Sequence, residues 1–597
     1  MWRPSGAHNT YETDQMKITQ FIGKREWGLA FIALVAIVVQ VFFDLRLPDY
    51  MQDITQIIVT PDPQTSDVLQ QGAYMLGCAL GSMAAAVVTG FCMAMIGATL
   101  SRNMRAAVFD QSMEFSMEEY NKFGAASLIT RSTNDVTQVQ MFVVMGLQMA
   151  IKSPILAVWA ITKIAGKNFT WTMATGAAVI LLLIMMSVLL SLVMPRMMRM
   201  QRITDDLNRV TREHLGGLRV IRAYNAQDFH DKRFEYTNTE LTDTNMFVMR
   251  SFAFMMPAMT SIMSGLSLAI YGLGASMINS ATDPSDKVRL FSEMIVFSAY
   301  AMQVIGAFMM LTMVFIFFPR ARVAYRRIRE VLTIPISIRD GQVSSADARG
   351  LVEFRNVDFR YPDADDDALH NVSFTARPGE TVAIIGATGS GKSSIVNLVP
   401  RFYDVREGQV LVDGVDVKDW KQADLRNRVA YVPQKATLFS GTISSNIDYG
   451  EGPKEIAPED IVEAARVSAS AEFIAEKEDG YASHVAQGGT NFSGGQKQRL
   501  SIARAVARGA EIMIFDDSFS ALDYRTDRDV RAALRESANN ATMIIVAQRI
   551  GTVRNADRIL VVDRGRIVGQ GTHEELMDNN QVYREIAFSQ LSEEELA

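Results

Sequence analysis

Long uncharged stretches in the first half of the chain constrain its fold more than any other feature. Five runs of 17 to 30 residues carry no charged residue: Trp27–Phe43, Gln71–Leu100, Asn168–Pro195, Ser251–Asn279 and Met294–Pro319. A sixth apolar run, Met141–Thr162, contains Lys152 as its only charge. About 20 apolar residues suffice for a helix to cross the hydrocarbon core of a membrane. We therefore predict six spans, over about residues 27–46, 70–100, 137–162, 168–195, 246–279 and 289–319.

The distribution of lysine and arginine predicts how these spans are oriented. Cations precede the first span, follow the last one, and crowd the long connections after the second and fourth spans, residues 101–140 and 196–245. Cytoplasmic segments of membrane proteins carry an excess of such residues. We expect both termini and both long connections in the cytoplasm, with the connections extending the spans as helices.

Composition excludes several classes of protein and separates the chain into two parts. The net charge of −7 argues against a general nucleic-acid binder. The two cysteines exclude a disulfide framework or a multi-cysteine metal site within the chain. All but three of the 35 methionines precede Arg320, and the exceptions are Met513, Met543 and Met577. Two dissimilar domains are therefore joined in one chain.

Two features of the spans invite a functional interpretation. Lys152 lies about midway through the third span, where a charge usually faces a polar cavity or a partner. We consider a role in a substrate path and, as the alternative, a structural ion pair or snorkelling. The abundant methionines suit surfaces that accept varied apolar ligands, although packing and lipid contact are the simpler explanation.

After Gly350 the pattern changes to short strands that alternate with helices, as in an α/β domain. The motif Gly386-Ala-Thr-Gly-Ser-Gly-Lys-Ser393 follows the apolar strand Thr381–Ile385 and opens a helix. In that context it predicts a phosphate-binding loop, in which backbone amides surround phosphates and a lysine reaches the β- and γ-phosphates. The predicted ATP contacts in this loop are Gly386, Thr388, Gly389, Ser390, Gly391, Lys392, Ser393 and Ser394.

A second element supplies an acidic group for magnesium. The apolar segment that begins at Glu511 ends in Asp516 and Asp517. A strand that ends in aspartate suits the Mg²⁺ shell of a phosphate-loop site. We predict that Ser393 and Asp516 bind Mg²⁺.

Further motifs resemble the ATP-binding cassette exporter family over nearly the whole chain. Ser493-Gly-Gly-Gln496 resembles the family signature, and Ser520-Ala-Leu-Asp523 the loop that crosses the dimer interface. Tyr361 resembles the aromatic residue that stacks on adenine, and Gln434 the residue that contacts Mg²⁺ and senses the membrane domain. Met117–Phe123 and Ala223–Phe229 resemble the two coupling helices that touch the nucleotide-binding domains.

The resemblance implies a complete architecture. A six-helix all-α transmembrane domain of the exporter type, residues 1–330, would precede a linker, 331–350, and an α/β phosphate-loop nucleotide-binding domain, 351–597. Two such domains would bind ATP and Mg²⁺ between them, head to tail. The signature residues Ser493, Gly494, Gly495 and Gln496, together with Asp523, would then contact the ATP held by the partner.

Two residues depart from the family pattern at the site of hydrolysis. Asp517 stands where the family usually has the glutamate that acts as general base, and its side chain is one methylene shorter. Gln548 stands where the family usually has a histidine that contacts the γ-phosphate, and an amide cannot become a cation. Together with Gln434, these residues form the predicted catalytic set. General base catalysis is typically worth about 10²–10⁴-fold, so we expect hydrolysis here to be slow.

The departures suggest an asymmetric heterodimer. We interpret the chain as the subunit of a bacterial plasma-membrane exporter, of the multidrug type, that holds ATP in a poorly hydrolytic site. Its signature would complete the competent site of a partner that carries the usual glutamate and histidine. The alternatives are a homodimer with a slow aspartate base and a regulatory ATP-binding subunit. Lipids, peptides and drugs all fit as substrates, and no nucleic acid is expected.

Overall fold

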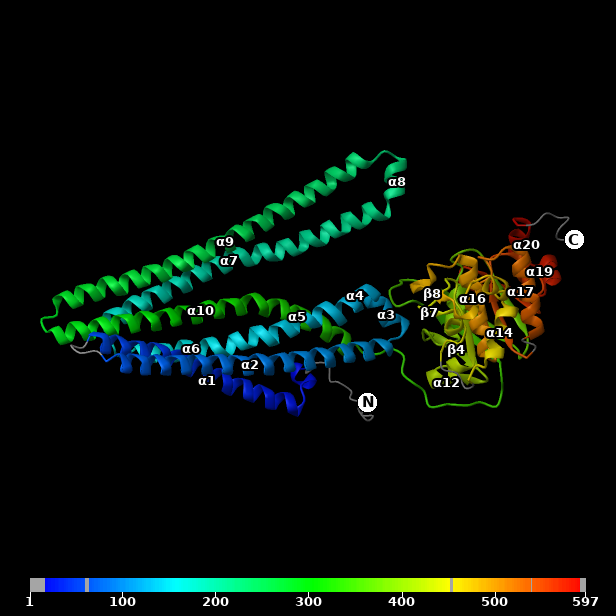
Figure 1. Ribbon diagram of the computed structural model, residues 1–597. Coiled ribbons are helices and arrows are strands. Elements are labelled where there is room, and N and C mark those ends of the chain that lie inside the picture. Colours follow the sequence, from blue (N-terminus) through cyan, green and yellow to red (C-terminus); the bar gives the residue numbers. More distant parts are fainter. Residues whose placement is uncertain (1–16, 60–63, 451–454, 538–539, 591–597) are drawn as a thin grey trace. The chain divides into compact units, whose positions relative to one another are not determined.

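The computed structural model describes residues 17–59, 64–450, 455–537 and 540–590, and these form two units (Figure 1). Unit 1 contains the chain up to Met113 and Ala125–Ile334. Unit 2 contains Glu114–Gly124 and the chain from Pro335 onward. Residues 1–16 and 591–597, for which a cytoplasmic location was expected, lie outside the described residues.

Unit 1 is built from long apolar helices. Among its described residues, six helices are long and apolar enough to cross a membrane. Five are uninterrupted: α1 (Lys24–Val59), α2 (Thr65–Met113), α7 (Phe169–Gly216), α9 (Gln227–Ser280) and α10 (Pro284–Thr333). The sixth joins α4 (Ala125–Thr130), α5 (Val136–Met141) and α6 (Leu147–Ile164) through π-helical turns at Arg131–Asp135 and Phe142–Gly146. Five of the predicted spans lie within these helices, and the span predicted over 168–195 begins one residue before α7.

Local chemistry explains where two of the long helices begin. The Asn168 side chain accepts hydrogen bonds from the amides of Thr170 and Trp171 and so caps α7. Asp283 caps α10 in the same way, accepting a hydrogen bond from the amide of Ser285. Pro284 occupies the first helical position, where the lack of an N–H group loses no hydrogen bond within the helix. Such caps satisfy amides that have no partner within the helix.

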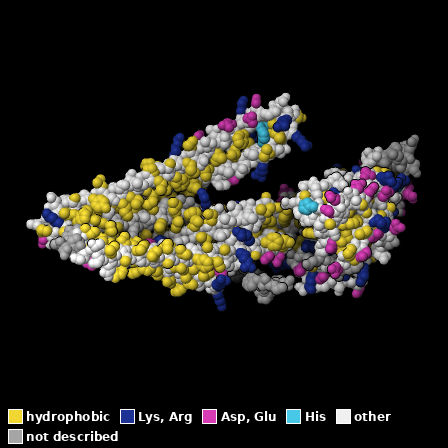
Figure 2. All heavy atoms as spheres, viewed as in Figure 1, with side chains coloured by type: hydrophobic (Ala, Val, Ile, Leu, Met, Phe, Trp, Pro, Cys, Tyr) yellow, Lys and Arg dark blue, Asp and Glu magenta, His cyan; other side chains and the backbone are white. Residues whose placement is uncertain are grey.

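Hydrophobic packing holds the helices of unit 1 together. Helix α1 packs along α2, α6 along α10, and α7 along α9. The fully buried Trp171 and Tyr300 are the largest side chains of its core, and the Trp171 ring lies 5.5 Å from that of Phe297. Figure 2 shows hydrophobic side chains along the outer surface of the long helices as well. This is the arrangement expected of helices that also face lipid.

Lys152 forms an ion pair inside unit 1. Its Nζ atom lies 3.4 Å from Oδ2 of Asp44 on α1, and the two side chains are 14% and 28% exposed. Ser82 of α2 donates a hydrogen bond to the same carboxylate. The contact supports a structural ion pair as the role of Lys152.

One segment that was predicted to be a coupling helix is not a single helix. The short helix between α7 and α9 is α8, Leu218–Ala223 (Figure 1). The predicted segment Ala223–Phe229 instead contains the last residue of α8, a turn and the start of α9. Asn225 in that turn has a φ of +49°, a left-handed conformation that ends a helix. The other predicted segment forms α3, Met117–Phe123, within unit 2.

Unit 2 is an α/β fold with two main sheets. A four-stranded sheet has the order β2-β1-β4-β5, and a six-stranded sheet has the order β12-β11-β3-β10-β9-β6. In the larger sheet the neighbours β11, β3, β10, β9 and β6 are parallel, and β12 is antiparallel at the edge. The strands are β1 (Val352–Phe359), β2 (Leu369–Ala376), β3 (Thr381–Ile385), β4 (Glu407–Val412), β5 (Val415–Asp416), β6 (Val429–Val432), β9 (Ile512–Asp516), β10 (Thr542–Val546), β11 (Arg558–Asp563) and β12 (Arg566–Gly571). A small pair, β7 (Gly441–Thr442) and β8 (His484–Val485), lies apart from them.

Helices cover the larger sheet because its central strands are apolar along their whole length. Every residue of β3, β9 and β10 is buried, which is typical of parallel strands covered on both faces. Helices α11 (Lys392–Leu398), α12 (Gln422–Asn427), α16 (Gly494–Arg508), α18 (Ile550–Val553) and α19 (His573–Asn579) contact strands of this sheet. The helices α13 (Ile443–Ile447), α14 (Pro458–Val467) and α15 (Ala471–Ala475) pack with α16 in a separate cluster. The remaining helices that follow the strands are α17 (Tyr524–Ser537) and α20 (Gln581–Phe588). The predicted order, apolar spans followed by an α/β domain, is confirmed.

Candidate nucleotide-binding site

The predicted site residues meet at one edge of the six-stranded sheet. The strands β3, β10, β9 and β6 are consecutive and parallel, so their carboxyl ends lie along the same edge. The phosphate loop follows β3, Gln548 follows β10, Asp516 ends β9, and Gln434 follows β6. Ligands of open α/β sheets bind at such an edge.

The backbone conformation and packing of the phosphate loop require glycine at two positions. Gly391 has a φ of +103°, which disfavours any side chain, and it directly precedes α11. A Cβ atom at Gly386 would lie 2.0 Å from the carbonyl oxygen of Val562, so the loop packs against β11 there. Thr388 and Gly389 are exposed, whereas Ser394 is buried at the start of α11. The exposed tip of the loop is thus open to a ligand.

Lys392 is buried, and its ammonium group donates to the loop carbonyls of Gly386 and Ala387, at 2.8 and 2.7 Å. Burial lowers the pKa of Lys392, and the carboxylates of Asp517 and Asp516 oppose that effect. A cation buried beside two carboxylates is stabilised by a further anion such as a phosphate. Ser390 is also buried, and its Oγ has no hydrogen-bond partner among the described residues.

The residues predicted to bind Mg²⁺ fit that ion. Ser393 donates a hydrogen bond to Oδ1 of Asp516 at 2.8 Å, so a hydroxyl and a carboxylate oxygen are already adjacent. Oxygen ligands of this kind are those that Mg²⁺ prefers. Burial raises the pKa of Asp516, while hydrogen bonds from Ser393 and Tyr431 act in the opposite direction. A divalent cation there would compensate the buried carboxylate.

The three residues predicted to act in hydrolysis are brought together around one oxygen atom. Oδ2 of Asp517 accepts hydrogen bonds from Nε2 of Gln548 at 2.9 Å and from Nε2 of Gln434 at 3.1 Å. The Asp517 backbone is left-handed, with a φ of +47°, a conformation that aspartate tolerates better than most residues. Asp517 itself is only 8% exposed. Its carboxylate is therefore held by both amides.

The signature residues form the start of a long helix that is open to solvent. Ser493 caps α16: its Oγ accepts from the amide of Gln496, whose side chain accepts in return from the amide of Ser493. Ser493 and Gly494 are exposed, and Gly495 and Gln496 are half-buried. Asp523 is exposed as well and caps α17, accepting from the amide and hydroxyl of Thr526. Among the described residues, no hydrogen bond joins the phosphate loop to the signature residues or to Asp523.

Tyr361, the predicted adenine contact, lies beside the phosphate loop. Its hydroxyl is 2.9 Å from Oγ of Ser394. Its ring meets the rings of Phe359 and Tyr403 edge to face, at 4.7 and 5.2 Å between centroids. Tyr361, Phe359 and Tyr403 therefore form an aromatic cluster, and the hydrogen bond of Tyr361 connects this cluster to the start of α11.

Two residues of the site carried no role in the sequence analysis. Tyr431 donates hydrogen bonds to Asn397 at 2.9 Å and to Oδ2 of Asp516 at 3.3 Å. Tyr403 packs against Tyr361. Tyr431 pairs with Ile514 in the register of β6 and β9, and Asp516 lies two residues further along β9, so both side chains point to the same face of the sheet. No local pattern in the sequence links Tyr403 to the site.

Comparisons with known proteins agree with this arrangement. The family described as ABC transporter matches residues 369–520, and the ABC transporter transmembrane region matches residues 30–308. An uncharacterised ABC transporter ATP-binding protein of Mycobacterium tuberculosis is 39% identical over 530 residues, which cover 88% of this chain and 90% of the relative. An ATP-dependent lipid A-core flippase of Pseudomonas fluorescens is 30% identical over 494 residues, 82% of this chain and 80% of the relative.

A solved structure shares the fold over most of this chain. The bacterial Atm1-family ABC exporter with ATP bound superposes with a TM-score of 0.78 at 24% identity, over 94% of this chain and 97% of its own. The predicted fold class, a six-helix transmembrane domain of the exporter type followed by a nucleotide-binding domain, is confirmed. The chain belongs to the ABC transporter family, as a multi-pass membrane half-transporter of the exporter type with one transmembrane and one nucleotide-binding domain.

Proposed function

We propose that this chain is one subunit of a heterodimeric ATP-driven exporter for amphipathic or lipophilic molecules. It would move them out of the cytoplasm or the inner leaflet of a bacterial plasma membrane, with its nucleotide-binding domain in the cytoplasm. Its own phosphate loop would retain ATP in a poorly hydrolytic site. Its signature would complete the competent site of a partner subunit. The occupied carboxylate of Asp517 is the observation on which this proposal rests.

The residues of the phosphate loop are suited to hold ATP. The backbone around Gly386 and Gly391 would surround the phosphates, and Lys392 would exchange its contacts with loop carbonyls for contacts with phosphate oxygens. Ser393, Asp516 and Gln434 would hold Mg²⁺, which when bound neutralises phosphate charge. Tyr361 would stack on the adenine ring.

Hydrolysis would be slow because the proton acceptor is poorly available. A general base must take a proton from the attacking water, and Oδ2 of Asp517 already accepts from two amides. The aspartate side chain is also a methylene short of the usual glutamate. Gln548 can donate a hydrogen bond but carries no charge to offset that of the γ-phosphate.

The signature residues favour a role in a second site. Ser493 and Gly494 lie exposed at the start of α16, a 15-residue helix whose first amides carry partial positive charge. A γ-phosphate presented by another subunit would find donors there. A productive site formed with this signature and an intact partner would account for ATP turnover by the complex.

The substrate class follows from the relatives and from the spans. Several relatives are lipid A-core flippases, and the spans here are apolar and rich in methionine. We therefore favour lipid-like molecules over polar ones. Uphill accumulation of a lipophilic probe in sealed vesicles, with and without ATP, would identify a pump. Its absence despite ATP binding would indicate a regulatory subunit.

The test of the asymmetric site compares two substitutions in the complex of this chain with its partner. Ser493→Ala should abolish most ATP hydrolysis, because it disables the competent site. Asp517→Ala should change turnover less than about twofold, because this site contributes little. Loss of turnover with Asp517→Ala would show instead that Asp517 is a working base, as in a homodimer.

A further inference from the structure

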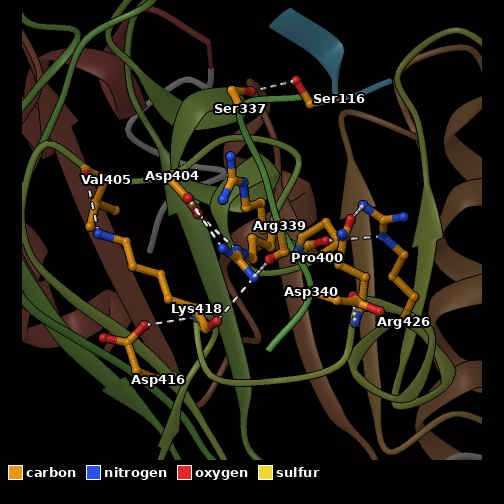
Figure 3. A network of polar contacts seen from close by, with 12 residues as sticks. Ser116, Ser337, Arg339, Asp340, Pro400, Asp404, Val405, Asp416, Lys418 and Arg426 are labelled. Carbon is orange, nitrogen blue, oxygen red and sulfur yellow. Dashed lines mark hydrogen bonds and ion pairs between the residues drawn. The ribbon is translucent and has the colours of Figure 1, made fainter. Parts of the chain in front are cut away.

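Helix α3 is attached to the nucleotide-binding domain through its capping residues. Glu119 accepts hydrogen bonds from the amide of Ser116 at 2.8 Å and from the amide of Ser337 at 2.9 Å. The hydroxyls of Ser116 and Ser337 lie 3.0 Å apart (Figure 3). Burial raises the pKa of Glu119, but the hydrogen bonds from Ser116 and Ser337 together outweigh it and lower the pKa overall. The helix and the segment at Ser337 are thus held by a buried carboxylate.

A second contact connects α3 to the aromatic cluster. Nδ2 of Asn121 donates a hydrogen bond to the hydroxyl of Tyr403 at 3.2 Å. Burial raises the pKa of Tyr403, so its hydroxyl stays protonated at neutral pH. The Tyr403 ring meets Tyr361 at 5.2 Å and Phe359 at 5.6 Å. Tyr403 therefore touches α3 with its hydroxyl and Tyr361 with its ring.

The turn that carries Tyr403 is fixed by a buried arginine. Arg401 is 4% exposed, and its backbone is left-handed, with a φ of +53°. Its guanidinium group donates to both carboxylate oxygens of Asp404, at 2.8 and 3.2 Å. It also donates to the carbonyls of Arg339 and Lys418, at 3.0 and 3.1 Å. Figure 3 shows these three partners converging from separate segments.

This geometry leaves Tyr403 little freedom to move alone. The Arg401–Asp404 contact sets its backbone, and Asn121 and Tyr361 contact opposite parts of its side chain. A shift of α3 that carries Asn121 with it would move the ring that packs on Tyr361. Tyr361 in turn is bonded to Ser394 at the start of α11.

We propose that Tyr403 is a positioning residue that links α3 to the adenine contact, so that the position of α3 sets the affinity for the base of ATP. The proposal rests on the proposed function, because it takes Tyr361 to be the adenine contact. By linkage the effect is reciprocal, and bound adenine would in turn restrain α3. The triphosphate of ATP would not sense the link, because it is held by the phosphate loop.

The test measures binding of two probes to the full-length chain in lipid nanodiscs by calorimetry. ATP carries the base, and inorganic tripolyphosphate lacks it. Asn121→Leu and Tyr403→Phe each remove the hydrogen bond between α3 and the cluster and should weaken ATP binding about two- to tenfold. Neither should change tripolyphosphate binding. The double variant should be no weaker than the weaker single variant, because both remove one interaction.

Two further variants separate the possible failures. Tyr481→Phe removes a tyrosine hydroxyl elsewhere in the same domain and should leave both affinities unchanged. Tyr361→Leu should weaken ATP binding about fivefold or more. If Tyr361→Leu has no effect, the adenine contact itself is wrong. If it has the expected effect while Asn121→Leu and Tyr403→Phe leave ATP binding unchanged, or weaken tripolyphosphate equally, the link through Tyr403 is wrong.

Discussion

Single carboxylates in this protein owe their properties to the groups that bind them. Asp516 faces a hydroxyl from the phosphate loop and a phenol from β6, whereas the neighbouring Asp517 faces two amides. The two residues are adjacent in sequence, yet the carboxylate of Asp516 is suited to bind a cation, whereas that of Asp517 already accepts hydrogen bonds from two side-chain amides. Their environments, more than their chemical type, separate their roles.

The hydrogen bonds that the Asp517 carboxylate accepts from Gln434 and Gln548 predict how ATP hydrolysis at this site could be increased. Asp517→Glu combined with Gln548→His should raise ATP hydrolysis at this chain's own site by about tenfold or more, because it lengthens the base and restores a titratable partner. Turnover should be measured in a complex whose competent site has been disabled by Ser493→Ala. Gln548→Asn, which keeps an amide, is the matched control and should show no increase. An unchanged rate in the double variant would place the defect outside these two residues.

The buried arginine of the Tyr403 turn predicts a loss of stability. Arg401→Ala leaves Asp404 and two backbone carbonyls without their donor and should cost about 3 kcal/mol. For a domain of this size such a loss lowers the melting temperature by about 6–12 °C, measurable by differential scanning fluorimetry. Arg466 also pairs with an acidic residue, Glu463, but at the surface, so Arg466→Ala should leave the melting temperature unchanged. Equal shifts for both variants would contradict this assignment.

At the scale of helices, polar contacts join elements that otherwise pack through apolar side chains. Lys152 on α6 reaches Asp44 on α1, and Lys163 on α6 reaches Asp49 on α1, at 3.4 and 2.6 Å. Tyr300 of α10 bonds to Asp49 as well. A charge within an apolar span is costly unless paired, so these contacts restrict how α1, α6 and α10 can slide past one another.

Pairing of Lys152 predicts a characteristic mutational pattern. Lys152→Met leaves the Asp44 carboxylate without its cation and should lower the melting temperature of the transporter. Adding Asp44→Asn should recover most of the loss, because removal of both charges is less costly than removal of one. Substrate affinity should be similar in the wild type and the double variant. A lower affinity that Asp44→Asn does not restore would indicate that Lys152 contacts substrate.

Across the whole molecule, one chain contains a transmembrane domain whose helices face lipid and a nucleotide-binding domain whose surface is charged. A mean hydropathy of +0.08 averages helices that face lipid with a charged nucleotide-binding domain. The family to which the chain belongs couples ATP hydrolysis to transport, and the proposed exporter contains two such chains. Whether the second chain is identical determines which site turns over.

The proposed asymmetry predicts the behaviour of the isolated chain. Purified alone in nanodiscs, it should bind ATP yet hydrolyse it slowly, and addition of a partner with an intact glutamate and histidine should raise turnover about tenfold or more. Vanadate-trapped nucleotide should then be recovered on the partner's phosphate loop. Robust, substrate-stimulated turnover by this chain alone would favour the homodimer.

The amino-acid sequence alone predicts the spans, the order of domains, the phosphate loop and the two departures at Asp517 and Gln548. Each depends on residues that are contiguous, since partition into lipid and the conformation of a loop are local properties. The helix predicted at Ala223–Phe229 is instead a turn between the end of α8 and the start of α9, a conformation that polar composition alone does not reveal.

Which distant side chains meet depends on how the strands and helices pack. Gln434 and Gln548 reach Asp517 across 83 and 31 residues because β6, β9 and β10 are neighbours in the sheet. Asn121 meets Tyr403 across 282 residues, and Lys152 meets Asp44 across 108. Strand order and helix packing arise from the sum of many weak contacts over the whole fold, so no local pattern in the sequence specifies these pairs.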